Sequence, residues 1–223
     1  MNKYLLTFEK KGYIKYTSHL DMQRFFQRVF RRSGIKLAYS QGFNPHPKMS
    51  FALPLSLGYT GLEELLEIET AIPYDTEEIK AKVNEIMPEG LSVVGVSVFE
   101  SKKTAGSMVN VAEFIVIIPV NDCDKRDYNK IGTDFMAQSA INTQKLQRKT
   151  GKILDIDIRP LIKDMVVNVV DNNIIIETTI AQGSQETLSP DLLVSTFVKF
   201  AGIDVEPVEI DFTRKRIIYT KPE

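Results

Sequence analysis

The sequence predicts an α+β protein built from two halves, each with the element order β-α-β-β-α-β. Its 223 residues are 43% hydrophobic and 26% charged, which suits one large or two small globular domains with real cores. Strand-like alternation and helix-like periodicity follow one another in the same order twice along the chain. A stretch of small and polar residues, 102–110, separates the two series and reads as a linker between domains at 1–101 and 111–223.

The first predicted strand covers residues 4–9, with an extension at 13–16 after a turn. A helix is expected between Ser18 and Gly34, because serine is a good N-cap and glycine is a natural C-terminal stop. Asp21, three residues after Ser18, gives a variant of the capping box. Apolar residues recur on one face of this helix, and arginines occupy the other face. The apolar residues are Met22, Phe25, Phe26, Val29 and Phe30, and the arginines are Arg24, Arg28, Arg31 and Arg32.

The rest of the first half completes the pattern. Residues 49–57 read as a strand interrupted by Pro54, which places it at a sheet edge or a bulge. The remaining expected elements are a half-buried strand at 64–70, a helix at 76–87 capped by Asp75, and a strand at 91–99. This order is that of the ferredoxin-like plan.

The second half approximates the same plan, which would make the chain a structural duplication without an obvious sequence repeat. Asp171-Asn172-Asn173 predicts a tight turn between two strands, and Ser189-Pro190 predicts a helix start. An insertion is expected around 149–163. The predicted strands are 113–120, 141–148, 165–170, 173–181 and one or two within 206–220, and the predicted helices are 124–139 and 190–201.

Composition excludes several classes of protein and site. No segment approaches the ~20 apolar residues of a membrane span, and the N-terminus lacks the apolar region and cleavage site of a signal peptide. We therefore expect a cytoplasmic protein without membrane contact. The single cysteine, Cys123, excludes an internal disulfide framework, a CxxC zinc site and a self-contained iron–sulfur cluster. The sequence also lacks P-loop, GxGxxG and HExxH patterns, and we expect no cofactor.

Charge is distributed unevenly along the chain although its net value is −1. Residues 1–58 contain ten Lys or Arg against two acids, whereas residues 59–101 contain ten acids against two lysines. A basic face of that size favours a polyanionic partner. The alternative is that the two segments pack together and neutralise each other.

Both histidines lie in the basic segment. His46 lies between two prolines that restrict the backbone, and its ordinary pKa near neutrality suits a phosphate contact or a general acid/base. The alternative is that the loop is only structural and that His46 points into solvent. For His19, at the start of the predicted helix, a structural role in the first turn is the favoured interpretation.

The arginine face is the candidate surface for RNA. Guanidinium groups fit phosphate oxygens, but a solvated face that pairs with Asp21 and the acidic strand at 63–69 is the alternative. Tyr39 and Phe43 are expected either to stack on unpaired bases or to belong to the core. The predicted RNA-binding residues are Arg24, Arg28, Arg31, Arg32, Lys36, Ser40, Gln41, Gly42, Phe43, Asn44, His46, Lys48 and Arg159.

Other basic residues extend this hypothesis to the second half. Taken together, they would allow a continuous RNA-binding groove between the two halves. They are Lys145, Arg148, Lys149, Lys152, Arg159, Arg214, Lys215 and Arg216.

Two strings, KYTSHLD at 15–21 and YSQGFNPHP at 39–47, resemble a particular bacterial family. It is the family of radical SAM-linked proteins of unknown function, found as free-standing chains or as the C-terminal domain of larger radical SAM proteins with a cobalamin-binding-type domain. Looser features at 157–160 and 183–190 extend the resemblance over the whole chain. The resemblance implies a separate radical SAM protein as partner, because this chain lacks the three-cysteine motif, and a setting near ribosome and RNA metabolism. It carries over no catalytic residue.

Three functions follow as hypotheses. The first is an accessory module, without catalytic activity of its own, that binds tRNA or rRNA and presents it to a radical SAM enzyme. The second is a metal-independent RNA endonuclease or other RNA-processing enzyme, with His46 as acid/base and Lys48 steadying the phosphate. The third is a protein-docking adaptor without RNA contact, whose acidic segment at 63–89 would dock the partner through Glu63, Glu64 and Glu67. The sequence predicts no oligomeric state.

Overall fold

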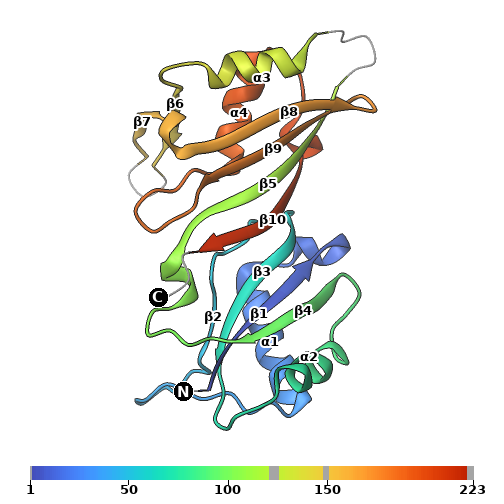
Figure 1. Ribbon diagram of the computed structural model, residues 1–223, viewed down its shortest axis with the longest axis vertical. Helices are drawn as coiled ribbons and strands as arrows, with labels where there is room; N and C mark the ends of the chain where they lie inside the picture. Colours follow the sequence, from blue (N-terminus) through green and yellow to red (C-terminus); the bar gives the residue numbers. More distant parts are fainter. Residues whose placement is uncertain (1, 121–125, 148–150, 220–223) are drawn as a thin grey trace. The chain divides into compact units, whose positions relative to one another are not determined.

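The computed structural model describes residues 2–120, 126–147 and 151–219 (Figure 1). The chain divides into two compact units: unit 1 runs up to Val109 and includes the residues from Arg214 onward, and unit 2 is Asn110–Thr213. Both units mix helices with antiparallel strands, so the predicted α+β class is confirmed. Cys123, Arg148 and Lys149 lie outside the described residues.

Unit 1 has the predicted order β-α-β-β-α-β. Its strands form an antiparallel sheet in the order β4-β1-β3, and the short β2 pairs with β3. The elements are β1 (Lys3–Lys10), α1 (His19–Ser33), β2 (Met49–Phe51), β3 (Thr60–Glu69), α2 (Thr76–Asn84) and β4 (Leu91–Val98), with 3-10 turns η1 (Gly12–Tyr16) and η2 (Ala105–Met108).

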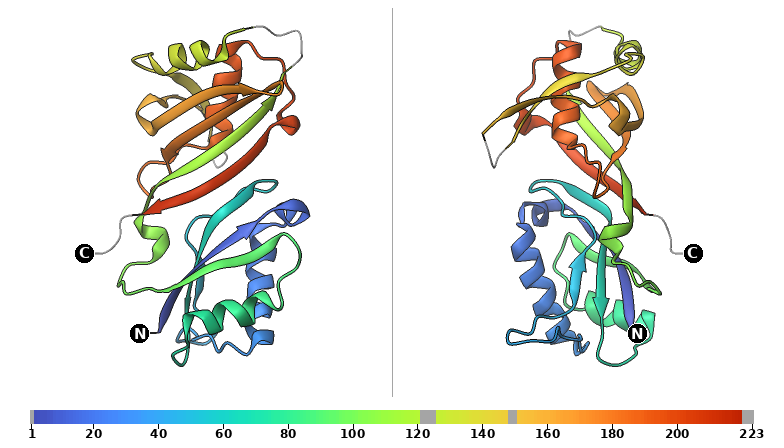
Figure 2. Two further views of the ribbon diagram at one scale, coloured as in Figure 1. Left: turned by 45° about the vertical axis from the view of Figure 1, so that its right-hand side comes forward. Right: turned by 90° about the vertical axis from the view of Figure 1, so that its left-hand side faces the viewer.

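The main core of unit 1 lies between this sheet and its two helices. The register opposes Leu6 to Leu66, and because side chains alternate along a strand, every second residue of β1 and β3 faces the helices. Apolar residues of α1 and α2 fill the space above them, and α1 can be followed beside the strands in Figure 2. The buried residues of this cluster are Tyr4, Leu6, Phe8, Met22, Phe26, Val29, Phe30, Ile35, Leu66, Ile68, Ile79, Val83, Leu91 and Val93.

Two predicted strands in unit 1 are corrected. The expected extension at 13–16 belongs to the 3-10 turn η1, which begins at Gly12 with a positive φ of 64°. The strand expected at 49–57 ends at Phe51. The carbonyl oxygens of Leu53 and Pro54 instead accept hydrogen bonds from the Arg214 guanidinium, so the chain leaves the sheet there.

The segment expected as a linker is packed. Ala105, Met108 and Val109 are buried in a second apolar cluster of unit 1, and the backbone N–H of Ala105 donates to Glu67 Oε2 over 2.8 Å. Gly106 passes close to Ala52, since an added Cβ would lie 2.7 Å from the Ala52 carbonyl oxygen. These contacts tie residues 105–109 to unit 1.

Unit 2 repeats the plan with a hairpin inserted after its first helix. β5, β9 and β8 form an antiparallel sheet in that order, whereas β6 and β7 pair only with each other (Figure 1). β10 starts in unit 2 and ends in unit 1. The elements are β5 (Val109–Pro119), α3 (Tyr128–Met136), β6 (Asn142–Leu146), β7 (Ile153–Asp157), η3 (Arg159–Leu161), β8 (Ile162–Val170), β9 (Asn173–Ala181), α4 (Pro190–Ala201), η4 (Pro207–Glu209) and β10 (Asp211–Tyr219).

The tight turn and the helix start predicted for unit 2 are both confirmed. Asp171 and Asn172 both have positive φ, as a tight hairpin turn of the primed type requires. Pro190 is the first residue of α4, and Gly202 ends that helix in the left-handed conformation. Among the helices that the structure describes, none is both long and apolar enough to cross a membrane.

Candidate nucleic-acid interface

Helix α1 carries the predicted arginine face. The Ser18 side chain accepts a hydrogen bond from the Asp21 backbone N–H and donates one to its carboxylate, so the helix starts where the sequence indicates. Gly34 ends it at a φ of 74°. With Met22, Phe26, Val29 and Phe30 buried, the opposite side faces solvent. All four arginines predicted for that side, Arg24, Arg28, Arg31 and Arg32, are exposed.

Most of these cations lack a partner within the protein. Arg24 lies 3.3 Å from Asp21 in an exposed pair, which contributes little to stability. In the part of the chain that the structure describes, the side chains of Arg28, Arg31, Arg32 and Lys36 make no hydrogen bond or ion pair. Three neighbouring guanidinium groups therefore remain available to an external anion.

The acidic strand β3 is neutralised by other residues. Glu64 forms a buried ion pair with Arg214, Glu67 lies 3.6 Å from Lys3, and Glu69 lies 3.0 Å from Lys48. Glu63 is exposed. Within the described ranges, no carboxylate of β3 pairs with an arginine of α1, so packing of the acidic strand does not neutralise the arginine face.

The segment after α1 forms a hairpin loop, defined here as residues 38–48. The Ser40 N–H donates to the His46 carbonyl, and the His46 N–H donates to Ser40 Oγ over 2.9 Å. At its base, the Lys48 N–H donates to the Ala38 carbonyl. These hydrogen bonds, called the clamp here, hold the tip of the loop, where Gly42 has a φ of 125° and Phe43 is fully exposed. Six predicted RNA-binding residues of this loop, Gln41, Gly42, Phe43, Asn44, His46 and Lys48, are exposed, and Ser40 is half-buried.

The two histidines lie in different environments. His46 is exposed at the end of the clamp. His19 is half-buried, with its ring edge-on to Phe51 at 5.2 Å between centroids. Burial lowers the pKa of His19, and the nearby charge of Lys10 lowers it further. His19 therefore favours its neutral form and packs as part of the fold.

Sequence reasoning missed a buried polar cluster. Glu64 and Arg214 are each 2% exposed, and Arg214 Nε donates to Glu64 Oε1 over 2.8 Å. Beside them Lys10 donates to the Thr17 carbonyl over 3.0 Å. Burial lowers the pKa of Lys10, the Glu64 carboxylate opposes this, and Arg214 adds to it. No local signal could reveal the pair, because its members lie 150 residues apart.

Not every predicted basic residue is available to RNA. Arg159 lies in unit 2, where its guanidinium donates to the carbonyls of Met136 and Ile162 over 3.0 and 3.4 Å. Arg214 is buried against Glu64. Both side chains hold the fold together. The exposed basic residues of unit 2 include Lys145 and Lys152.

A pocket of about 480 Å³ opens where α1 ends. It lies between the last turn of α1 and the base of the hairpin loop. Its lining combines apolar, aromatic and basic groups, namely Gln27, Phe30, Arg31, Gly34, Ile35, Lys36, Leu37, Tyr39, Pro47 and Ala71.

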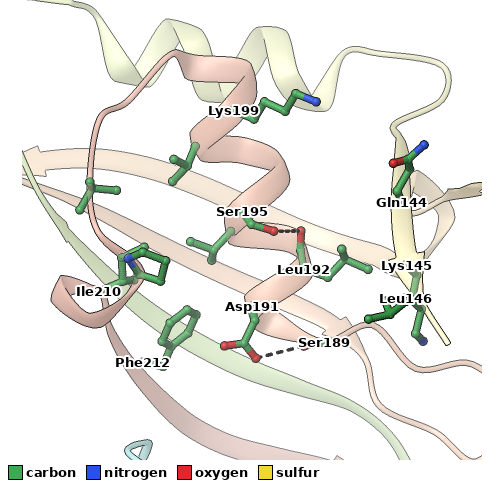
Figure 3. Close-up of a pocket in the computed structure, with 14 residues that line it drawn as sticks. Gln144, Lys145, Leu146, Ser189, Asp191, Leu192, Ser195, Lys199, Ile210 and Phe212 are labelled. Carbon is green, nitrogen blue, oxygen red and sulfur yellow. Dashed lines mark hydrogen bonds between the residues drawn. The ribbon is translucent and has the colours of Figure 1, made fainter. Parts of the chain in front are cut away.

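A second pocket, of about 550 Å³, lies in unit 2 between α4, β6 and the segment leading into β10 (Figure 3). Apolar side chains dominate its wall, among them Leu192, Ile210 and Phe212. Its small polar groups already have partners: Ser195 Oγ donates to the Leu192 carbonyl, and Ser189 Oγ donates to Asp191. The groove is thus mainly apolar, and Lys145 and Lys199 also belong to its lining.

Comparison with known proteins identifies a family and a fold. Residues 3–190 match the family model described as an uncharacterized protein conserved in bacteria, DUF2344. No curated protein matches the chain. A chain of a Cbf5-Nop10-Gar1 complex is 8% identical, with a TM-score of 0.53 over 96% of this chain and 48% of its own. The present chain thus spans about half the length of that relative, and the likeness supports the ferredoxin-like fold alone.

Two further solved structures are more distant. The small subunit of acetolactate synthase from Thermotoga maritima is 14% identical over 100% of this chain and 99% of its own, with a TM-score of 0.27. An unknown protein from Galdieria sulphuraria is 9% identical over 97% and 98%, with a TM-score of 0.25. These scores are too low to support an argument.

Proposed function

The chain belongs to the conserved bacterial family DUF2344, and from that premise we propose that it is an accessory module that binds RNA and partners a separate radical SAM enzyme. The observation that carries the RNA-binding part is the row of arginines on α1 that β3 leaves unpaired. Residues 59–101 contain ten acids, yet in the described part of the chain none of them pairs with Arg28, Arg31 or Arg32.

The arrangement suits a flexible polyanion. Arg28, Arg31 and Arg32 project from a helix that is anchored by a buried aromatic face, so their positions along the backbone are fixed. Guanidinium forks bind phosphate oxygens in two-point contacts. The hairpin loop adds Phe43, whose exposed ring can stack on a base. Phosphate contacts supply affinity, and the ring supplies a preference for accessible bases.

The partner rests on the resemblance of the two motif strings to radical SAM-linked proteins. Both strings now have positions in the fold: the first ends in the cap and first turn of α1, and the second is the hairpin loop. They belong to one unit with the arginine face. RNA binding by unit 1 is compatible with delivery of that RNA to a separate enzyme.

Titration of a labelled oligouridine against salt tests the RNA-binding part. We expect the double variant R28A/R31A to bind more weakly and to lower the slope of log K against log salt by about 1.4, since each phosphate contact with a single strand contributes roughly 0.7. The matched control is K130A/K199A, which removes two exposed cations from helices of unit 2. Equal losses in both double variants, or no binding by the wild type, would contradict the proposal.

Purification of the native protein from its own cells tests the partner. We expect a radical SAM protein to co-elute and to be identified by mass spectrometry. RNA recovered without such a protein would leave an RNA-binding module and remove the partner from the proposal.

A further inference from the structure

We propose that the pocket at the end of α1 receives one unpaired nucleotide of the bound RNA, with the base inside and its phosphate on Arg31 and Lys36. The inference rests on the proposed function and specifies which part of the RNA the protein reads. It concerns the 480 Å³ pocket lined by α1 and the hairpin loop. Its volume falls within the range of roughly 300–1,000 Å³ typical of small-molecule sites.

The pocket has an apolar floor with an aromatic wall. Phe30 and Ile35 are almost fully buried, and Leu37 packs on the same core. Tyr39 is 52% exposed, so a large part of its surface is open to a ligand. A planar base would cover this apolar surface and stack on the tyrosine ring.

The base of the pocket is held in place by tyrosines. The hydroxyl of Tyr74 donates to the Gly34 carbonyl and accepts a hydrogen bond from the Lys36 N–H over 3.0 Å. Tyr74 is itself held by Tyr4, whose hydroxyl donates to the Tyr74 carbonyl and accepts from its N–H. The turn that carries Lys36 is thus ordered before any ligand arrives, which reduces the entropic cost of binding.

Charge selects a phosphate-bearing ligand over a neutral aromatic one. Arg31 and Lys36 both line the pocket, and neither side chain has a partner within the described part of the chain. None of the described residues that line the pocket is acidic. A nucleotide phosphate at the rim of the pocket would form ion pairs with both of these cations.

The pocket offers little for reading base identity. Two nearby carbonyls are already engaged, since Phe30 O accepts from Ser33 Oγ and Gly34 O accepts from Tyr74. Gln27 supplies the one side-chain amide in the lining. We therefore expect discrimination between paired and unpaired nucleotides to exceed discrimination among bases, because a base within a duplex has both faces stacked and cannot enter.

Filling the pocket without touching its cations tests the inference. Ala71 lines the pocket and is exposed, so A71L adds bulk there, and A81L adds the same bulk on the exposed side of α2. The probes are a labelled oligouridine and a self-complementary RNA duplex with the same number of phosphates. We expect the wild type to prefer the single strand, and A71L to lose roughly tenfold in affinity for it, the equivalent of one stacked base. A81L should bind as the wild type does, and A71L should bind the duplex normally.

The outcomes separate this inference from the proposed function. Equal binding of both probes by the wild type, or an unchanged preference for the single strand in A71L, would overturn the pocket proposal. The proposed salt-sensitive RNA binding by the arginine face would still stand. Absence of binding to either probe would overturn both. An equal loss in A71L for both probes would likewise overturn the pocket proposal, because the effect would then not depend on an unpaired base.

Discussion

Strand β3 and helix α1 lie in the same unit and carry opposite charge, yet they do not neutralise each other. The carboxylates of Glu64, Glu67 and Glu69 each have a cationic partner, whereas the guanidinium groups of Arg28, Arg31 and Arg32 have none in the described residues. The acidic strand obtains its partners from β1, the hairpin loop and β10. A charge count along the sequence treats the two regions as complementary, but the fold pairs the acidic residues internally and leaves the three arginines exposed without a partner among the described residues.

The same difference decides which surface can dock a protein. Of the three glutamates expected to form an acidic docking surface, Glu64 is buried and Glu67 is half-buried against Lys3. Only Glu63 is exposed. The acidic strand is therefore chiefly a structural element, and the arginine face is the stronger candidate for recognition.

The largest effect should come from breaking the buried ion pair of strand β3. E64A leaves the Arg214 guanidinium buried and unpaired, so we expect the free energy of unfolding to fall by about 3–5 kcal/mol. The matched control is E69A, which removes an exposed pair with Lys48 and should cost about 0–1 kcal/mol. Urea unfolding of both variants measures the difference. Similar losses would mean that burial does not distinguish the two pairs.

Substitutions on the exposed surface of the hairpin loop should lower the affinity for RNA and leave the stability of the protein almost unchanged. F43A removes an exposed ring at the tip of the hairpin loop, and we expect roughly a tenfold loss of affinity for single-stranded RNA. Its stability should change by less than about 0.5 kcal/mol, as for other surface positions. Y13A removes an exposed ring elsewhere in unit 1 and is the control for aromatic surface in general. An equal loss in Y13A would show that RNA contact is not concentrated on the hairpin loop.

The smallest effect concerns His19, the first residue of α1, whose ring packs on Phe51. Burial and the charge of Lys10 lower the pKa of His19 from its ordinary 6.5. Below pH 6.5 the unfolded chain therefore binds this proton more readily than the folded chain, and stability should fall as the pH falls through the folded pKa. H19Q should weaken that dependence while differing from the wild type by a constant amount well above pH 6.5. Unfolding curves at a series of pH values test this, and parallel profiles would exclude His19 as the source.

Much of the fold follows from signals within a few residues of one another. Three- and four-residue spacing marked the buried face of α1, and Ser18 and Gly34 marked its ends. Asp75 caps α2 by accepting hydrogen bonds from Glu77 and Glu78, again at the predicted place. Such features depend on local geometry, which a sequence displays directly.

The errors arise where distant segments decide the outcome. Alternation along residues 64–70 indicates an acidic outer face, but Glu64 lies inside because Arg214 supplies a partner that the pattern cannot reveal. Strand β2 is shorter than expected since the same guanidinium takes the carbonyls after it. In unit 2 the predicted insertion is a hairpin, because β6 pairs with β7 and not with the main sheet.

The sequence is enough to predict most residues of the candidate interface, but only part of their arrangement in space. The sequence indicated the arginines, the hairpin loop and its aromatic residues. It did not indicate the pocket, because the lining brings together Gln27, Lys36 and Ala71 from separate segments. The hydrogen bond from the Lys36 N–H to the Tyr74 hydroxyl holds the turn that carries Lys36. The sequence also assigned Arg159 to RNA, although that side chain bonds to two carbonyls of its own unit.

The division of the chain has a consequence for its synthesis. Unit 2 is continuous, whereas unit 1 needs residues from both sides of it. On the ribosome, Glu64 emerges long before its partner Arg214, so unit 1 cannot form this buried ion pair until the residues of unit 2 have been made. Domains generally fold as units during translation. The nascent chain can therefore complete unit 2 before unit 1, and the unit that carries the arginine face gains its buried ion pair only after unit 2 has been made.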